Sequence, residues 1–324
     1  DQHILSLITH HIVCDRISVS VFLKELVSLY EGKSLNPMSI QYADWAEWQR
    51  NQLQGEQLTK QLDYWKTRLA NPLPILELPT TDIPSPGDQI ARKTPLRIDR
   101  ELSQRIKRLA GECHVSLFTF LLATFKLFLH RYSGQHDLVV GSEVANREHP
   151  ETIRMIGLLV NTLVFRTDID GAANFEEMLK RVHNTVVGGL EHQDLPFEKL
   201  VEELNPTRDT DQLSPLFQVK FDLQPISAAP LTEMSGVRLE RFAIEDTQSK
   251  YALRFNLQDT DDGIQGQVEY SRGFFADTTI ANMIRHYTNI LAAVSQNISR
   301  PISTYDVIDE TERQEILAFS RGPT

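Results

Sequence analysis

Helix-like and strand-like segments alternate along most of this chain, and that order restricts the fold more than any other feature. The longest apolar run, residues 117–129, has the length of a buried helix and is followed by a strand-like run at 137–145. Further strand-like runs lie at 158–167, 217–223, 237–244 and 253–270, the last with a turn at 261–263. The order predicts a layered α/β sandwich.

Helical spacing of apolar residues predicts the remaining elements. The expected helices lie at 19–30, 41–70 with a break near 55, 101–111, 116–132, 174–191, 278–294 and 310–319. A short helix is also expected near residue 151. Residues 79–87 are rich in proline and have no apolar period, so we expect a domain or subdomain boundary there.

Charge and cysteine content exclude some function classes. The 324 residues carry a formal net charge of -11, which argues against nucleic acid as a partner. Cys14 and Cys113 have no metal-ligand spacing, and a reduced cytoplasmic compartment is the simplest expectation. Residues 117–129 are too short and too interrupted to span a bilayer, so we expect no membrane partner. The chain starts at Asp1 without a signal peptide, as an excised piece would.

One segment of this acidic chain is basic. Its positive residues are Arg92, Lys93, Arg97, Arg100, Arg105, Lys107 and Arg108. Two interpretations remain open: a solvated basic face, or a docking patch for an acidic partner.

Two adjacent histidines close an apolar run near the start of the chain. The run 4–13 is short and rich in Ile and Leu, which predicts a buried strand. Because side chains alternate along a strand, we expect His10 and His11 to point to opposite faces. Asp15 follows four residues after His11, where it either caps the next helix or has a more specialised role.

Several kinds of site have no support in the sequence. No glycine-rich loop of phosphate-binding form follows a strand, no Cys/His cluster has metal-ligand spacing, and no Gly-x-Ser-x-Gly nucleophile elbow is present. We therefore expect no metal site. A histidine at a strand end is suited to take a proton or orient an amine or hydroxyl near neutral pH. Taken alone, however, a His-His pair is more often structural.

Five elements in order resemble the condensation domains of nonribosomal peptide synthetases. His10–Asp15, followed by Ser18, resembles the family's HHxxxDG motif. The other matching elements are Tyr42–Trp48, Ile156–Leu163 with Arg166, His192–Glu198, and Arg208-Asp209 before Ser214–Leu216. Residues 308–324 are similar to the linker that leads to an adenylation domain.

The resemblance implies two chloramphenicol-acetyltransferase-like α/β subdomains that face each other across a tunnel. Residues 1–78 would be the latter part of an incomplete N-terminal subdomain, which would expose apolar surface. Residues 79–93 would be a linker, 94–305 the C-terminal subdomain, and 306–324 the linker toward an adenylation domain. Donor and acceptor carrier proteins would be the partners, with substrates carried on phosphopantetheine and no cofactor bound.

The resemblance also implies residue roles. His11, with His10 and Asp15, would form the catalytic motif, and His11 would position the acceptor amine or accept its proton. Asp15 would pair with an arginine, for which Arg147 and Arg166 are the candidates. The substrate-tunnel residues would be Arg16, Ser18 and Asn161. The resulting reaction is peptide-bond formation, and the form of the strand around Asn161 favours it over epimerisation.

One departure from the motif keeps other functions open. Arg16 stands where the family has glycine, and its bulk and charge either narrow the tunnel or point to solvent. The competing hypothesis is a non-catalytic module that only docks carrier proteins or other partners. A free-standing acyltransferase is disfavoured by the C-terminal linker.

Overall fold

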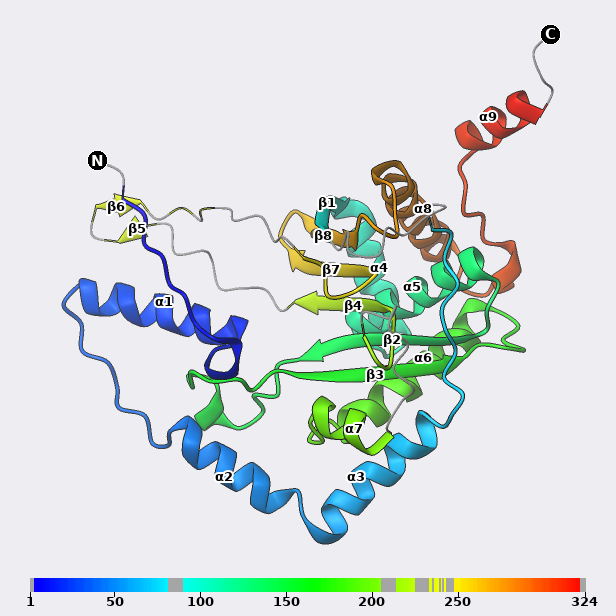
Figure 1. Ribbon diagram of the computed structural model, residues 1–324. Coiled ribbons are helices and arrows are strands. Elements are labelled where there is room, and N and C mark those ends of the chain that lie inside the picture. Colours follow the sequence, from blue (N-terminus) through cyan, green and yellow to red (C-terminus); the bar gives the residue numbers. More distant parts are fainter. Residues whose placement is uncertain are drawn as a thin grey trace.

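The structure is a computed structural model that describes residues 3–80, 90–204, 214–224, 233–234, 236–238, 240, 242 and 248–320. Its centre is a six-stranded mixed sheet with the order β1-β8-β7-β4-β2-β3 (Figure 1). The strands are β1 (Ala91–Ile98), β2 (Asp137–Val144), β3 (Asn161–Asp168), β4 (Val219–Gln224), β7 (Leu253–Thr260) and β8 (Gly263–Ser271). A separate two-stranded sheet joins β5 (Glu233–Met234) to β6 (Val237–Arg238).

Strand β4 runs parallel to both of its neighbours, β2 and β7, while the other pairs in the large sheet are antiparallel. The β7–β8 hairpin turns at Gly263, whose φ is +119°. A Cβ there would lie 2.4 Å from the carbonyl oxygen of Ile98 on β1, so the turn requires glycine. The predicted turn at 261–263 and the α/β fold class are confirmed.

A layer of helices packs against the sheet and consists of α4 (Arg100–Glu112), α5 (Leu117–Ser133), α6 (Phe175–Glu191) and α8 (Asp277–Gln296). The α5 segment is helical because Ser116 caps its first turn and Gly134 ends it in the left-handed conformation. The Phe125 ring of α5 contacts Phe221 of β4 and Phe255 of β7, with centroid distances of 5.0 and 4.8 Å. These contacts identify the helix-facing side of the sheet.

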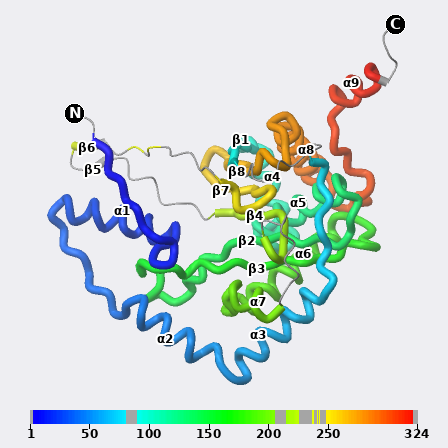
Figure 2. Tube along the Cα trace, viewed as in Figure 1, coloured from blue at the N-terminus to red at the C-terminus, as the bar shows by residue number. Residues whose placement is uncertain are grey.

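The first helices of the chain, up to Arg68, curve around the sheet as an arc (Figure 2). It comprises the 3₁₀ turn η1 (His11–Val13), α1 (Arg16–Tyr30), α2 (Tyr42–Gln52) and α3 (Gly55–Arg68). The break between α2 and α3 confirms the expected interruption near Gly55. The Trp65 indole of α3 donates to the His192 carbonyl, 2.9 Å away, beside α7 (Phe197–Leu204), which anchors the arc to the main body.

The predicted strand at 4–13 is wrong. Residues 3–10 have no regular structure, and residues 11–13 form η1. A strand needs a neighbour to satisfy its backbone groups, and no described strand pairs with these residues. Apolar side chains in the segment stay in solvent, with Ile4 and Ile8 74% and 93% exposed.

Some expectations fall on residues that the structure does not describe. These are most of the proline-rich stretch 79–87, the Arg208-Asp209 pair, parts of the expected strand 237–244, and the last residues of the tail, 321–324. The described C-terminal elements are η3 (Ile302–Thr304) and α9 (Glu310–Ser320), and η2 (Pro150–Thr152) precedes β3. Among the described residues, no single helix is long and apolar enough to cross a membrane; α4 and α5 meet that test only together, across a 106° bend.

Candidate active site

His11 lines a cavity of about 580 Å³ between η1, the start of β3, the start of α7 and one face of the sheet. Its Nδ1 lies 3.0 Å from the carbonyl oxygen of Cys14. Because a carbonyl only accepts, Nδ1 carries the hydrogen, and Nε2 of the neutral ring has the lone pair. His11 is therefore oriented by its own turn to present a proton acceptor.

His10 has a different role in the same turn. Its Nδ1 accepts a hydrogen bond from the backbone N–H of Ile12 at 3.2 Å and caps η1. His10 is not among the residues that line the cavity. The two histidines thus make different contacts, but not through the strand alternation that was expected, because His10 caps η1 and His11 begins it.

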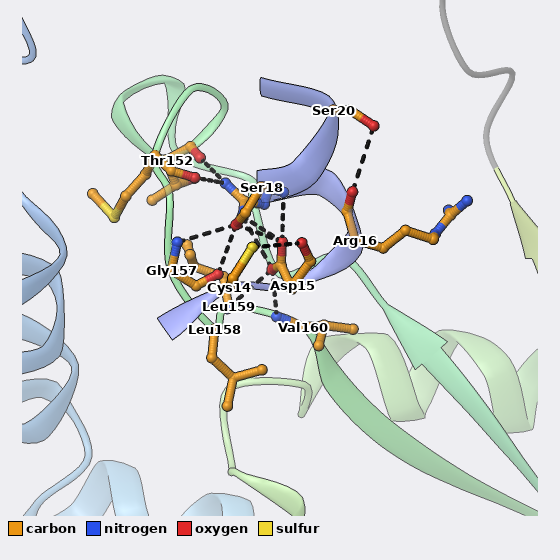
Figure 3. Close-up of polar contacts among 12 residues, drawn as sticks. Cys14, Asp15, Arg16, Ser18, Ser20, Thr152, Gly157, Leu158, Leu159 and Val160 are labelled. Carbon is orange, nitrogen blue, oxygen red and sulfur yellow. Dashed lines mark hydrogen bonds and ion pairs between the residues drawn. The ribbon is translucent and has the colours of Figure 1, made fainter. Parts of the chain in front are cut away.

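Asp15 is the centre of a buried polar cluster, the Asp15 cluster, formed with Ser18, Arg147 and the backbone of residues 157–160. Figure 3 shows how Ser18 and residues 157–160 surround it. Its carboxylate accepts from the Ser18 backbone N–H at 2.8 Å, which caps α1. It also accepts from Arg147 Nη2 at 2.9 and 3.0 Å. The backbone N–H groups of Leu159 and Val160 complete its coordination at 3.2 and 3.3 Å.

These partners decide the charge of Asp15. Burial raises the pKa of its carboxyl, but the hydrogen bonds from Ser18, the Arg147 charge and the Leu159 N–H outweigh burial and hold the pKa below its usual 3.8. Asp15 is therefore an ionised anchor that ties the His11 turn to the segment before β3. It is 3% exposed and is not among the cavity-lining residues.

Of the two arginines that were candidates for pairing with Asp15, Arg147 forms the ion pair. Arg166 instead binds Asp137 of β2, with Nη2 2.7 Å from Oδ2, and donates to the Ala70 carbonyl at 2.6 Å. The expectation for Arg166 was wrong because β3 carries it six residues beyond Val160. At about 3.3 Å per residue, that places it roughly 20 Å along the strand.

Asn161 lines the cavity, as expected, and connects β3 to α7. Its side-chain Nδ2 donates to the carbonyls of Gln193 and Leu195, both at 2.8 Å. Its Oδ1 accepts from the Phe197 backbone N–H at 3.0 Å. The side-chain amide of Asn161 thus holds the His192–Glu198 element against the Ile156–Leu163 element.

Ser18 and Arg16 do not line the cavity. Ser18 is fully buried, and its hydroxyl lies 2.8 Å from Asp15 Oδ1 and 3.0 Å from the Gly157 backbone N–H. Arg16 is exposed at the start of α1, its side chain extends away from the Asp15 cluster (Figure 3), and it donates to Gln224 at the end of β4. Arg16 does not simply point to solvent, since it bonds to Gln224 and its charge helps to lower the pKa of the cavity residue Glu143.

The Tyr42–Trp48 element also contacts the segment before β3, at residues 157–158. The Tyr42 hydroxyl donates to the Leu158 carbonyl at 3.0 Å. A Cβ at Gly157 would lie 2.1 Å from the Tyr42 ring, so only glycine permits this close contact. Sequence elements far apart in the chain therefore converge on residues 157–161.

The cavity has a charged wall that the sequence motifs did not predict. Glu143 of β2, Arg254 of β7 and Glu269 of β8 line it together with Tyr251. The signal was present in the strands, since Lys220, Asp222 and Arg254 interrupt otherwise apolar runs. Charged residues at alternate strand positions ordinarily indicate a solvated face, so the sequence did not reveal a cavity there.

Comparisons with known proteins cover the residues of this site. Residues 1–317 match the family described as "Condensation domain". The chain is 41% identical to a component of the linear gramicidin synthase of Brevibacillus parabrevis, over 98% of its own length and 4% of that protein. It is 36% identical to surfactin synthase subunit 1 of Bacillus subtilis (strain 168), over 99% of the chain and 9% of that protein.

Solved structures show the same fold. The X-domain from teicoplanin biosynthesis is 26% identical with a TM-score of 0.80, over 92% of this chain and 70% of that one. The condensation domain of the monacolin K polyketide synthase is 21% identical with a TM-score of 0.79, over 90% and 69%. The family match spans almost the whole chain and includes the residues that line the cavity. The chain belongs to the condensation domain family.

Proposed function

We propose that the chain forms peptide bonds between donor and acceptor aminoacyl or peptidyl thioesters held on carrier proteins. The observation that carries this proposal is His11, whose Nδ1 is fixed by the Cys14 carbonyl while the ring lines the cavity. The relatives are synthases of linear gramicidin and surfactin, of which this chain spans only 4% and 9%. Their names and the family support amide-bond chemistry here.

In the proposed reaction, the acceptor amine attacks the carbonyl carbon of the donor thioester. A C–N bond forms, the C–S bond breaks, and the donor carrier's thiol leaves. His11 Nε2 takes the amine proton as the tetrahedral intermediate forms, or orients the amine through the same lone pair, and the proton then passes to the leaving thiolate. The Asp15 cluster contributes by positioning the turn that holds His11.

The partners follow from the same proposal. Each substrate arrives on the phosphopantetheine of a donor or acceptor carrier protein, and the chain itself binds no cofactor. An adenylation domain is the proposed neighbour of the C-terminal segment. Here α9 is held to α8 because Glu312 accepts from His286 at 2.7 Å and pairs with Arg285 at 2.9 Å.

The competing docking-only hypothesis depended on Arg16 obstructing the tunnel. Arg16 is exposed and is not among the residues that line the described cavity, which weighs against an obstructed tunnel. We therefore favour the catalytic function.

The test uses the full-length protein with donor and acceptor aminoacyl groups loaded on carrier proteins, and mass spectrometry of the product. We expect His11→Ala to lower the rate of product formation by about 10²–10⁴, the usual contribution of a positioned acid–base group. His10→Ala is the comparison variant: it removes the adjacent imidazole outside the cavity together with the cap of η1, so we expect a smaller loss than for His11→Ala. Equal rates for the parent and His11→Ala would contradict the role of His11.

A further inference from the structure

A row of charged side chains lies on the sheet face opposite the helix layer; we call it the charge ladder. Its members are Glu143 on β2, Lys220 and Asp222 on β4, Arg254 on β7 and Glu269 on β8. Arg254 is the register partner of Lys220 on one side and of Glu269 on the other. Because the alternate residues Phe221 and Phe255 face α5, the ladder residues face away from it.

The inner members of the ladder are buried and paired. Lys220 and Asp222 are 0% and 1% exposed. Asp222 accepts from Arg254 Nε and from the Glu143 backbone N–H, both at 2.8 Å. The Glu143 carboxylate accepts from Lys220 and lies 3.3 Å from Arg254 Nη2, while the Tyr251 ring covers Lys220 with its centroid 4.9 Å from Nζ.

Such burial distinguishes the ladder from a solvated sheet face. Charged residues are almost never fully buried unless they are paired, and Lys220 and Asp222 fit that exception. A buried ion cluster is, however, weak evidence for stabilisation, because well-packed apolar residues of similar volume often stabilise a fold as well or better. Packing alone therefore gives no reason for charges at these positions.

The ladder's outer members form part of the wall of the cavity that His11 lines. The side chains of Glu143 and Arg254 are 32% and 20% exposed and line it, as does Glu269. The Arg254 guanidinium has five N–H donors, and Asp222 and Glu143 occupy two of its nitrogens. The wall thus presents both donors and acceptors, in alternating signs that largely neutralise one another.

We propose that the charge ladder recognises the side chain of a carrier-bound substrate and prefers a polar carboxamide side chain to an apolar one of similar size. A wall in which positive and negative side chains alternate can bind a group that both donates and accepts hydrogen bonds. It favours such a group over an apolar one and over one with a full charge of either sign. The inference rests on the proposed function, because it assigns the occupant of the cavity as an aminoacyl thioester.

The test compares two probes of similar length, in which glutamine or methionine is joined through an amide to the amine analogue of pantetheine. Their binding to the full-length protein is measured by calorimetric titration. Hydrogen bonds to charged groups are the stronger ones, so we expect the parent to bind the glutamine amide about tenfold or more tightly. Glu143→Met with Arg254→Met should lower that ratio several-fold, with Glu269 still lining the cavity. Lys220 and Asp222 remain in this variant and compensate each other.

The matched control removes an ion pair from the opposite side of the same strand. Lys107 of α4 and Asp259 of β7 lie 2.5 Å apart, and position 259 is an odd number of residues from 254. Lys107→Gln with Asp259→Asn should keep the preference. If the double methionine variant does not fold by circular dichroism, Arg254→Lys keeps the cation but loses the planar fork, and the preference should again fall.

Equal binding of the two amides by the parent would overturn the inference, and so would an unchanged preference in the folded ladder variant. Failure of the proposed function has a separate signature. The coupling assay would then give no product with either side chain, whereas the binding ratio is measured without turnover.

Discussion

The Asp15 cluster and the charge ladder both bury ionised groups near the cavity, but they differ in the groups that surround those charges. Asp15 takes its bonds largely from rigid donors, including the backbone N–H groups of Ser18, Leu159 and Val160. The ladder joins side chains on adjacent strands, and Glu143 and Arg254 also reach the cavity. The first arrangement positions backbone, whereas the second forms a surface that a ligand can touch.

The two carboxylates at their centres differ in the direction of their pKa. Burial raises the pKa of Asp15, yet its hydrogen bonds and Arg147 outweigh burial and lower it overall. Burial also raises the pKa of Asp222, and there the charges of Lys220 and Arg254 do not cancel the effect. The charge of the neighbouring Glu143 also raises the pKa of Asp222, so the ladder places a like charge beside its central carboxylate.

The largest expected effect comes from breaking the Asp15 cluster. Arg147→Met leaves Asp15 buried without its cationic partner, which should lower the free energy of unfolding by about 3–5 kcal/mol. Arg166→Met is the control, because the Arg166–Asp137 pair is partly exposed and should contribute only about 0–1 kcal/mol. Urea unfolding measures both. Equal losses would show that Asp15 does not depend on Arg147.

A pH series should separate the two carboxylates. The Asp15 contribution is present above pH 3.8 and is lost as pH falls through its lower folded pKa, so the stability advantage of the parent over Asp15→Asn should grow from acid toward neutral pH. The Asp222 pKa is raised, so an ionisation penalty develops above pH 3.8 and the advantage over Asp222→Asn should shrink. Urea unfolding at each pH measures the two slopes. If the stability advantage changed with pH in the same direction in both comparisons, the two carboxylates would not differ as expected.

The smallest expected effect is at Arg16, which is exposed, donates to Gln224 and acts on the ladder residue Glu143 through its charge. Arg16→Gly should change the free energy of unfolding by about 0.5 kcal/mol or less and leave the rate of product formation unchanged. Thermal unfolding and the carrier-based assay provide the measurements. A marked gain in product formation would return Arg16 to the tunnel and restore the docking-only hypothesis.

Local periodicity predicted most elements because burial imposes it. The 117–129 run became α5, and the helix expected at 19–30 became the latter part of α1, with Asp15 as its cap. The strand at 4–13 failed because an apolar run reveals that residues suit burial, not whether a neighbouring strand lies beside them. The domain boundaries remain predictions.

The candidate site was predictable only where single residues carry the signal. His11 and Asn161 line the cavity as expected, because each belongs to an element that its resemblance to the family identified. Glu143 and Arg254 were missed, since nothing local distinguishes a charged strand residue facing a cavity from one facing water.

By itself, the sequence determined the α/β class, the family resemblance and the histidine that would do the chemistry. Only the tertiary structure decided that Arg147 rather than Arg166 binds Asp15, that Arg16 reaches Gln224 at the end of β4, and that charges on neighbouring strands form the charge ladder. The physical reason is distance. Helix caps and apolar periods act between near neighbours in sequence, whereas an ion pair between residues 15 and 147 depends on where the whole fold brings them together.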